Sequence, residues 1–259
     1  MATPALEWRV EEACLNAWPA LREVLLDGWL LRFSKGVSRR ANSANPLRAD
    51  CAAGGSVIDQ IEALYRRQEQ PTIFRVPSFV GAAIEEPLIA RGYRSEGDTC
   101  VLYGDMNAVA AAADSSVELA PQPGAAWLAA MAALQEHSDP QRRVYRRIVQ
   151  AIAVPTAFAG LRIGGRLAAL AYGSVADRLL CYESVITHPE QRRQGLAWRV
   201  VAAIAAWGRD QGARGVCLQV EAGNTPARAL YDRFGLTTEL YRYHYRRQPN
   251  TVPAGGSSP

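Results

Sequence analysis

Cysteine and histidine are both scarce in this sequence. Five cysteines and three histidines occur among 259 residues. The cysteines are odd in number and widely spaced, and none belongs to a CxxC or mixed Cys/His pattern. The sequence therefore predicts neither a disulfide framework nor a metal site. We expect reduced, buried cysteines at Cys14, Cys51, Cys100, Cys181 and Cys217.

Targeting and membrane signals are also lacking. The first residues, MATPALEWRVEEA, do not show a basic stretch followed by an apolar one, which is the pattern of a secretory signal. The longest apolar helix-like run, VVAAIAAWG, is far too short to cross a bilayer. We expect a cytoplasmic protein with no membrane partner.

Signatures of nucleic-acid and nucleotide binding are missing too. The formal net charge is only +4, the arginines are scattered, and no aromatic–basic RNA-binding motif appears. The chain contains neither G-x-G-x-x-G nor the P-loop pattern. A mild basic excess suits a single anionic small ligand at least as well, and we expect no nucleic-acid partner.

The composition that remains is typical of a soluble globular protein. Apolar residues make up 49% and charged residues 21%, and the length allows one large domain or two of ordinary size. Strand and helix patterns are mixed along the chain, which predicts an α/β or α+β sheet covered by helices.

The first half of the chain, about residues 6–106, contains alternating helix and strand patterns. Helical spacing and strand-like apolar runs predict its elements. The expected helices are Glu7–Leu21, Gly54–Glu69 and Ala82–Arg91, and the expected strands are Gly28–Phe33, Ala41–Pro46, Thr72–Val76 and Thr99–Met106.

The second half, about residues 117–247, repeats this mixture. A Gly164–Gly165 turn between two apolar runs predicts a hairpin. The other expected elements are helices at Ala125–Gln135, Gln141–Val149 and Ala197–Gln211, a strand LLCYESVIT, a strand VCLQVEA, a helix TPARALYDRFG and a strand ELYRYHYRR.

Composition also predicts the domain boundaries. An alanine-, serine- and proline-rich stretch separates the halves and reads as a linker. We expect a first domain at 1–108, a linker or start of the second domain at 109–124, a second domain at 117–247, and a disordered tail at 248–259.

One basic loop, PEQRRQGLAWR, lies between the strand ending at Thr187 and the following helix. The first turn of a helix leaves backbone N–H groups without partners, and its dipole makes that end positive. A phosphate can bind there if the backbone allows close approach. Gly195 permits that approach, Ala197 is small, and Arg192 and Arg193 add positive charge. By itself the R-x-x-G-x-A pattern is a weak signal.

Two motifs together give a far more specific one. The stretch ITHPEQRRQGLAWRVV, followed by EAGNTPARALYDRFGL, resembles the acetyl-CoA-binding core of the GCN5-related N-acetyltransferases. The family pattern R/Q-x-x-G-x-G/A matches Arg192, Gly195 and Ala197. The pattern N-x-x-A-x-x-x-Y-x-x-x-G-F has its counterpart in Asn224, Ala227, Tyr231 and Gly235, with Leu236 in place of phenylalanine. The resemblance covers about residues 117–247.

The resemblance implies an acetyl-CoA site that needs no metal. It implies that the strand edge at Val185–Thr187 pairs with the pantetheine arm, and that backbone amides of Arg193–Ala197 hold the pyrophosphate. Asn224 would bond the pantetheine. The implied cofactor-binding residues are Val185, Ile186, Thr187, Arg192, Arg193, Gln194, Gly195, Leu196, Ala197, Asn224, Ala227 and Arg228.

The same resemblance implies two catalytic side chains. Tyr231 would give a proton to the leaving thiolate, while a main-chain N–H near Ile186 stabilises the oxyanion. Glu183, on the strand before the loop, would remove the proton of the attacking amine directly or through water. A salt-bridged strand residue is an equally good interpretation of Glu183.

The first half lacks the phosphate-loop pattern, yet EEPLIARGYRSEGDTCVLYGDM resembles the closing helix–GY–strand unit of the family. We therefore expect two tandem domains of this fold, each a mixed, mostly antiparallel sheet flanked by helices, the first being degenerate. The run DGWLLRFSKGVSRRANSANPL resembles a segment of tandem aminoglycoside 2'-N-acetyltransferases, including those that act on kasugamycin.

The amine acceptor is expected to contact both halves. Candidate substrate-binding residues are Trp29, Arg40, Asn42, Ser43, Glu136, His137 and Asp139. The alternative is that Trp29 is a core residue, that Arg32 pairs with Asp27, and that the acidic residues are ordinary surface groups. The arginines of RRVYRR (142–147) are expected on a solvated helix face, or at the 3'-phosphate of the adenosine.

The function predicted from these residues is acetyl-CoA-dependent N-acetylation of a small primary amine. An aminoglycoside such as kasugamycin is the most specific candidate, and antibiotic resistance would be the role. Acetylation of a peptide or protein amine and a non-catalytic acyl-CoA-binding module are alternatives. The chain is expected to be a monomer or a homodimer.

Overall fold

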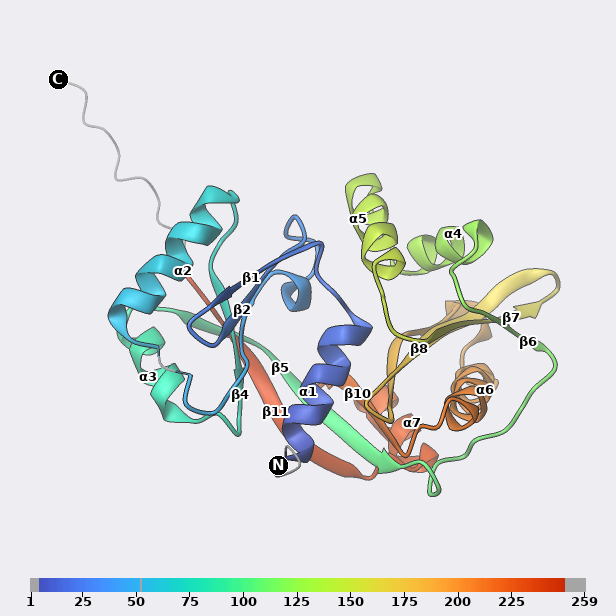
Figure 1. The fold of residues 1–259 in the computed structure, drawn as a ribbon. Coiled ribbons are helices and arrows are strands. Elements are labelled where there is room, and N and C mark those ends of the chain that lie inside the picture. Colours follow the sequence, from blue (N-terminus) through green and yellow to red (C-terminus); the bar gives the residue numbers. More distant parts are fainter. Residues whose placement is uncertain (1–4, 52, 250–259) are drawn as a thin grey trace. The chain divides into compact units, whose positions relative to one another are not determined.

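The computed structural model describes residues 5–51 and 53–249 of the chain, drawn in Figure 1. Helices and strands alternate along these residues. The α-helices are α1 (Leu6–Ala17), α2 (Gly55–Arg67), α3 (Ala82–Ala90), α4 (Ala125–Leu134), α5 (Asp139–Gln150), α6 (Leu196–Asp210) and α7 (Thr225–Phe234). The strands are β1 (Arg22–Leu26), β2 (Trp29–Phe33), β3 (Ala44–Pro46), β4 (Ile73–Pro77), β5 (Arg94–Asp105), β6 (Val117–Ala120), β7 (Thr156–Ile163), β8 (Arg166–Ala176), β9 (Leu179–Thr187), β10 (Gly215–Glu221) and β11 (Thr238–Arg247).

The strands form one mixed, eleven-stranded sheet with helices packed on it. Their order is β1-β2-β3-β4-β11-β5-β10-β9-β8-β7-β6. Among the described pairings, β3 with β4 and β9 with β10 are parallel, whereas the hairpins are antiparallel. The expected mixed α/β fold is confirmed, but a single sheet replaces the two separate sheets of a tandem arrangement.

The chain divides into two compact units whose limits differ from the predicted halves. Among the described residues, unit 1 comprises 5–21 and 99–242, and unit 2 comprises 22–51, 53–98 and 243–249. The N-terminal helix α1 thus belongs to the same unit as the basic loop, and strands β5 and β11 each run from one unit into the other. The amino-acid composition does not change where a strand passes from one unit into the other. For this reason the composition predicted a domain boundary in the alanine-rich stretch instead.

In unit 1, helices cover both faces of the strands. The Tyr182 hydroxyl donates to the carbonyl of Val201 on α6 at 2.7 Å, and the neighbouring Cys181 contacts Cys14 on α1. Because successive strand residues point to opposite faces, α6 and α1 must lie on opposite faces of β9 (Figure 1). α1 is further held by the Tyr172 hydroxyl, which donates to the Ala17 carbonyl at 2.9 Å.

The predicted linker is largely bound to unit 1. Residues 117–120 form strand β6, which pairs with β7, and Val109 is buried in the core. Ahead of this strand, Asp114 forms an ion pair with Arg199 of α6 at 2.7 Å. Alanine-rich composition predicted a loose connection, but small side chains also let a segment lie close against a helix.

Unit 2 has its own core beneath α2 and α3. Phe74 packs edge-on against Trp29 at 5.2 Å between ring centroids and against Tyr93 at 5.5 Å. The final residues of β11 pair with β4, and Gln248 donates its backbone N–H to the Thr72 carbonyl at 2.9 Å. The predicted tail is therefore bound at its first residue, and residues 250–259 lie outside the described ones.

Three predicted element limits need correction. Helix α1 ends at Ala17 rather than Leu21, and the exposed hairpin strand β1 follows it. The predicted strand 41–46 shrinks to β3, because a 3-10 turn at Arg39–Ala41 precedes it. β5 begins at Arg94, five residues before the prediction. Within the described part of the chain, no helix is long and apolar enough to cross a membrane.

Candidate active site

Strands β9 and β10 separate on the carboxyl side of their pairing. Their parallel register runs from Leu179↔Gly215 to Tyr182↔Leu218. Beyond this point β9 continues to Thr187 and β10 to Glu221 without further described pairing between them. The backbone at Ile186 and Thr187 therefore pairs with β8 on one side, and no pairing with β10 is described on the other side. This is the edge at which Val185, Ile186 and Thr187 are predicted to meet pantetheine, and all three side chains are half-buried.

A β-bulge lies at the same place. Tyr172 of β8 faces Glu183, whereas Leu170 faces Ile186, so β9 carries one more residue than β8 between these pairs. Ser184, within the bulge, has a φ of 54°, which is rare for a residue with a side chain. Such an insertion bends the strand and redirects its side chains. The separation of β9 from β10 thus coincides with a local change in the direction of β9.

The basic loop adopts a backbone shape suited to an anion. Arg193 and Gly195 both have positive φ, 63° and 74°, and α6 begins at Leu196 with Gly195 as its N-cap. Left-handed residues next to a helix N-terminus turn successive backbone N–H groups toward one concave face, which attracts anions. A Cβ added at Gly195 would meet no atom within 4 Å, so space in front of this backbone is open. Arg192, Arg193 and Gln194 are exposed beside it.

Glu183 and Tyr231 are buried in unit 1 and are electrostatically coupled. Glu183 is 5% exposed and Tyr231 is 7% exposed. Burial, together with the nearby Glu183 carboxylate, raises the pKa of Tyr231 well above its ordinary value. The phenol is therefore kept protonated at neutral pH. A buried carboxylate can accept a proton, and a buried, protonated phenol can donate one. Together they could serve a reaction that needs both transfers.

Helix α7 uses several of the predicted cofactor residues for its own structure. The Asn224 side chain caps the helix by accepting the Ala227 N–H at 3.2 Å. Arg228 pairs with Glu239 at 3.0 Å and also donates to the Ala222 carbonyl at 3.2 Å. Asn224 remains exposed, while Arg228 is largely committed within the chain. A structural role thus accounts for part of the second motif.

The acceptor residues predicted in the first half do not form an open surface, and this corrects the expectation. Trp29 is fully buried, and Ser43 and Asn42 are 0% and 3% exposed. The Asn42 side chain accepts N–H groups of Ser34 and Gly36 at 2.6 and 2.9 Å and donates to Ser38 at 2.6 Å. Its polar atoms therefore stabilise the loop that precedes β3. The alternative interpretation, that Trp29 is a core residue, is confirmed.

Of two neighbouring arginines, Arg32 and Arg40, the first has an ion-pair partner other than the predicted one. Arg32 is 1% exposed, and its ion-pair partner is Glu23 at 3.3 Å rather than Asp27. Burial lowers the pKa of Arg32 to about 10. Arg40 lies half-buried in the same unit, and its backbone carbonyl accepts a hydrogen bond from Arg32 at 2.9 Å. Its side chain thus stays a predicted, untested contact for the substrate.

The loop between α4 and α5 lies close to the bulge. Glu136 and Asp139 are exposed there, and the His137 ring packs against Tyr145 with 5.2 Å between centroids. The Tyr145 hydroxyl donates to the Ser184 hydroxyl at 3.0 Å, which connects this loop to β9. Burial, followed by the charge of Arg142, lowers the pKa of His137. His137 is therefore neutral at physiological pH.

Sequence reasoning missed Ser184 and Tyr145. Tyr145 lies within RRVYRR, whose arginines are exposed as predicted, but the tyrosine itself is 4% exposed and points inward. The apolar spacing of Val144, Tyr145, Ile148 and Val149 was the available signal, since these residues share one helix face. The Ser184 bulge had no signal in the sequence.

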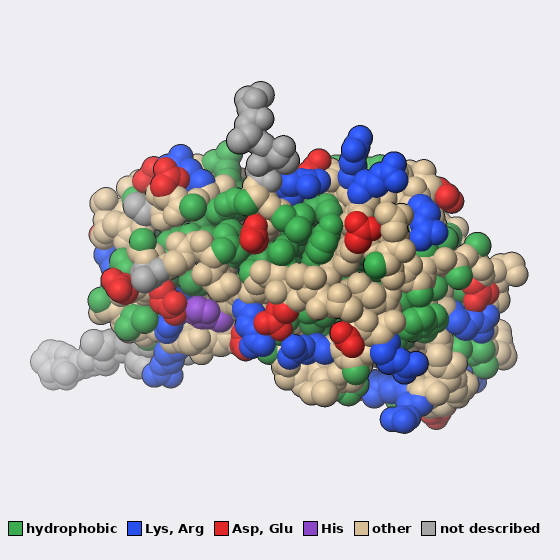
Figure 2. Space-filling model, turned by 90° about the horizontal axis from the view of Figure 1, so that it is seen from below, with side chains coloured by type: hydrophobic (Ala, Val, Ile, Leu, Met, Phe, Trp, Pro, Cys, Tyr) green, Lys and Arg blue, Asp and Glu red, His purple; other side chains and the backbone are tan. Residues whose placement is uncertain are grey.

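On the face shown in Figure 2, basic side chains are interspersed with acidic and apolar ones.

Comparison with known proteins agrees with this arrangement. A family model described as "Probable histone acetyltransferase Rv0428c C-terminal" matches residues 8–246. The chain belongs to this family. It is a GCN5-related N-acetyltransferase, as the two motifs predicted, and its fold is one that binds acyl-CoA.

Individual relatives cover most of the chain. It is 23% identical over 242 residues to "Uncharacterized N-acetyltransferase YobR" of Bacillus subtilis (strain 168), covering 92% of this chain and 97% of that protein. It is 30% identical over 211 residues to "Probable histone acetyltransferase Rv0428c" of Mycobacterium tuberculosis, covering 79% of this chain and 62% of that protein, which is less than two thirds of its length.

A solved structure shares the fold over nearly the whole chain. The GCN5-related N-acetyltransferase from Kribbella flavida has a TM-score of 0.71 and 15% identity, covering 95% of this chain and 97% of that one. A likeness at this identity speaks for the fold alone. The acetyltransferase family is thus established.

Proposed function

We propose that this acetyltransferase transfers the acetyl group of acetyl-CoA to a primary amine of a small molecule, with Glu183 and Tyr231 moving the protons. The observation that carries the proposal is the coupling of a buried carboxylate to a buried phenol of raised pKa, next to a strand edge and a phosphate loop. Acetyl-CoA, when bound, supplies the acetyl group as a reactive thioester.

The phosphate loop supports binding of the donor. Backbone N–H groups from Arg193 to Ala197 would hold the pyrophosphate at the N-terminus of α6, where the helix dipole favours negative charge. The open edge of β9 from Val185 to Thr187 would pair with the amide groups of pantetheine. The exposed Asn224 amide nitrogen would donate to the same arm.

The buried pair supports the direction of proton movement. An amine is protonated in neutral solution and must lose a proton before it can attack. Glu183 would accept this proton directly or through one water, and Tyr231 would donate to the departing thiolate. The raised pKa of Tyr231 keeps its proton in place until the thiolate needs it. The alternative for Glu183 is a purely structural charge within the strand.

The most specific acceptor that we propose is an aminoglycoside such as kasugamycin, with antibiotic resistance as the role. Its support is the resemblance of DGWLLRFSKGVSRRANSANPL to a segment of tandem aminoglycoside acetyltransferases. Exposed Glu136 in the α4–α5 loop and exposed Asp139 at the start of α5 add negative charge that suits a polycation. Trp29, Asn42 and Ser43 contribute to the fold of this segment rather than to an open acceptor surface.

A second candidate acceptor is a lysine or terminal amine of a protein. The printed descriptions of the matched family and of the Mycobacterium tuberculosis relative favour it, since both name a probable histone acetyltransferase. The chemistry at Glu183 and Tyr231 would be the same. Only the surface that orients the amine would differ.

A thiol-release assay separates these candidates. The purified chain with acetyl-CoA is offered kasugamycin, other aminoglycosides, small polyamines and a lysine-rich histone peptide. We expect thiol release with at least one aminoglycoside and little with the peptide. Turnover of the peptide alone would replace the small-molecule acceptor by a protein, and no turnover of any amine, with acetyl-CoA bound, would contradict the proposed catalytic roles.

We also propose that unit 2, with part of β5, is a degenerate copy of the acetyltransferase fold without a donor site. Its support is the missing phosphate-loop pattern and the helix–Gly-Tyr–strand sequence from α3 to β5. Calorimetry with acetyl-CoA should therefore give one site per chain. Two equal sites would contradict the degenerate copy, whereas loss of the single site in a Gly195 variant would support it.

A further inference from the structure

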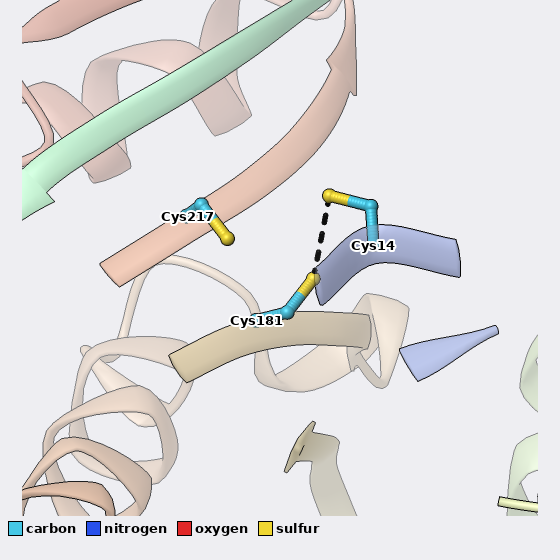
Figure 3. A group of neighbouring side chains, drawn as sticks. All are labelled: Cys14, Cys181 and Cys217. Atoms are coloured by element: carbon cyan, nitrogen blue, oxygen red, sulfur yellow. Dashed lines mark hydrogen bonds between the residues drawn. The ribbon is translucent and has the colours of Figure 1, made fainter. Parts of the chain in front are cut away.

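Three cysteines from distant parts of the sequence meet inside unit 1. Cys14 lies on α1, Cys181 on β9 and Cys217 on β10, and Figure 3 shows their side chains pointing toward one another. Their sulfur atoms all lie within 4.8 Å of one another, and the Cys181 and Cys14 sulfurs are 3.7 Å apart. All three are in the thiol form and at most 3% exposed. We call this group the thiol cluster.

The fold explains why the thiol cluster forms. Cys181 and Cys217 are direct partners in the parallel register of β9 and β10, so their side chains stand on the same face of the sheet. That face is the one covered by α1, where Cys14 points inward among Val10, Ala13 and Ala17. Nothing in the spacing along the chain indicates this meeting, because 167 residues separate Cys14 from Cys181.

The dimensions of the thiol cluster suit one metal ion. A point equidistant from three sulfurs at these separations lies about 2.6 Å or less from each, close to a metal–sulfur bond of about 2.3 Å. The other two cysteines, Cys51 and Cys100, are equally buried but belong to no such group among the described residues. Burial of cysteine alone therefore does not produce this geometry.

We propose that Cys14, Cys181 and Cys217 form a binding site for a single soft, thiophilic metal ion, copper(I), bound by three sulfur atoms. Soft sulfur ligands favour copper(I), whereas closed zinc sites use four donors. Among the described histidines, cysteines and acidic residues, the cluster contains three thiols and no fourth donor. A three-donor site of sulfur alone, sealed from water, fits copper(I) better than zinc.

The binding step balances without an oxidant or reductant. Each bond from copper to an ionised sulfur replaces an S–H bond, the proton leaves to solvent, and copper remains in the +1 state.

Occupation of the site would join three elements of unit 1. One ion bonded to Cys14, Cys181 and Cys217 ties helix α1 to strands β9 and β10, and ligands that bind only the folded state stabilise it. Because Cys14 comes from a helix far from the strands in sequence, the unfolded chain does not hold the three sulfurs together. Copper(I) should therefore raise the melting temperature.

The test uses the full-length, reduced protein under anaerobic conditions. Copper(I) is titrated in competition with a coloured bicinchoninate chelator, and zinc(II) is titrated in a parallel sample. We expect one copper(I) retained per chain, a higher melting temperature, and an X-ray absorption spectrum with three sulfur neighbours. Zinc should not be retained under the same competition.

Variants assign the site. Cys14→Ala, Cys181→Ala and Cys217→Ala should each lose copper retention, while Cys51→Ala and Cys100→Ala serve as matched controls and retain it. The melting temperature of each metal-free variant shows that it is folded, and a serine variant replaces any alanine variant that is not. Any of four results would overturn the proposal. These are no copper retained by the wild type, equal retention after loss of Cys14 and Cys181, nitrogen or oxygen neighbours of the copper ion, and tight binding of zinc.

Discussion

At the scale of single residues, environment decides the chemistry of this site more than residue type does. Tyr231 and Tyr182 are both buried tyrosines in unit 1, and burial raises the pKa of each. The Tyr182 hydroxyl donates to the Val201 carbonyl, whereas the phenol of Tyr231 is influenced by the Glu183 carboxylate. Only Tyr231 is thus proposed to give up a proton during turnover.

Replacing Tyr231 by phenylalanine tests that role. We expect kcat to fall about a hundredfold or more, because the leaving thiolate loses its proton donor, while the Kd for acetyl-CoA changes little. The wild-type rate should fall toward acid pH, where the amine is protonated, and again at alkaline pH, where the phenol loses its proton. Only the alkaline decline should disappear in the variant. Steady-state thiol release across pH measures both effects.

Tyr103→Phe is the matched control, because Tyr103 is a half-buried tyrosine on β5 of the same unit, outside the proposed site. Its kcat should equal that of the wild type. An unchanged kcat in Tyr231→Phe would remove Tyr231 as the acid.

Environment also explains why some residues predicted to bind the substrate do not form an open surface. Trp29, Asn42 and Ser43 are chemically suited to bind a substrate, but each is buried in unit 2. A sequence lists the side chains that are available, whereas burial decides which of them a substrate can reach. Glu183 is buried as well, but its strand separates from β10 directly beyond Tyr182.

At the scale of elements, the junction of the basic loop and α6 depends on one left-handed glycine. Gly195 has a φ of 74° and caps the helix. Replacement by valine should weaken acetyl-CoA binding about tenfold or more, because strain of about 1–2 kcal/mol distorts the loop and the new side chain occupies the open space in front of the backbone. Isothermal titration calorimetry measures the Kd.

The matched control is Gly165→Val in the β7–β8 turn. Gly165 also has a positive φ, 82°, and open space around its Cβ position. This variant should lose stability in the same way and keep the wild-type Kd for acetyl-CoA. Equal Kd values for Gly195→Val and the wild type would show that the loop does not hold the donor.

The pair of Asp114 and Arg199 attaches the segment before β6 to the same helix. Hydrogen bonds from Arg199 and Ser116 hold the pKa of Asp114 far below its ordinary value. This contribution to stability is complete above the ordinary aspartate pKa and is lost as pH falls through the lowered one. Asp114→Asn should therefore reduce the free energy of unfolding by less than about 1 kcal/mol at pH 7, since the pair is partly exposed.

Urea unfolding at several pH values checks this prediction. The difference from the wild type should shrink toward acid pH, and Asp210→Asn, an exposed change on the same helix, should have no comparable effect. A difference independent of pH would mean that the ion pair is not its source.

Elements with strong internal patterns were predicted well, and those set by their neighbours were not. Helices α2, α3, α4, α6 and α7 and the β7–β8 hairpin fall within a few residues of their predicted limits. Strand β1 was missed because its side chains are mostly exposed and show no apolar alternation. Its pairing with β2, rather than its own sequence, makes it a strand.

At the scale of the whole molecule, strands β5 and β11 belong to both compact units. Strands shared in this way couple the two cores, so we expect one cooperative unfolding transition. Phe74→Ala in unit 2 and Ile204→Ala in unit 1 should each lower the free energy of unfolding by about 2–5 kcal/mol and shift that single transition.

Urea titrations followed by far-ultraviolet circular dichroism and by tryptophan fluorescence measure it. The buried Trp29 and Trp127 report on units 2 and 1. Coincident curves support coupling. Two separated transitions, each moved by only one of the two substitutions, would show that the units unfold independently.

The sequence by itself determined the acetyltransferase family, and it predicted the donor and the loop that would hold its phosphates. Those depend on short contiguous motifs, in which a glycine conformation and a helix N-terminus are local properties of the chain. Tertiary structure alone decided the rest. Each of the remaining features depends on residues that are distant in sequence and that only packing and strand register bring together. These features are the burial of Trp29 and Asn42, the bulge at Ser184, the place of α1 in unit 1, and the meeting of Cys14, Cys181 and Cys217.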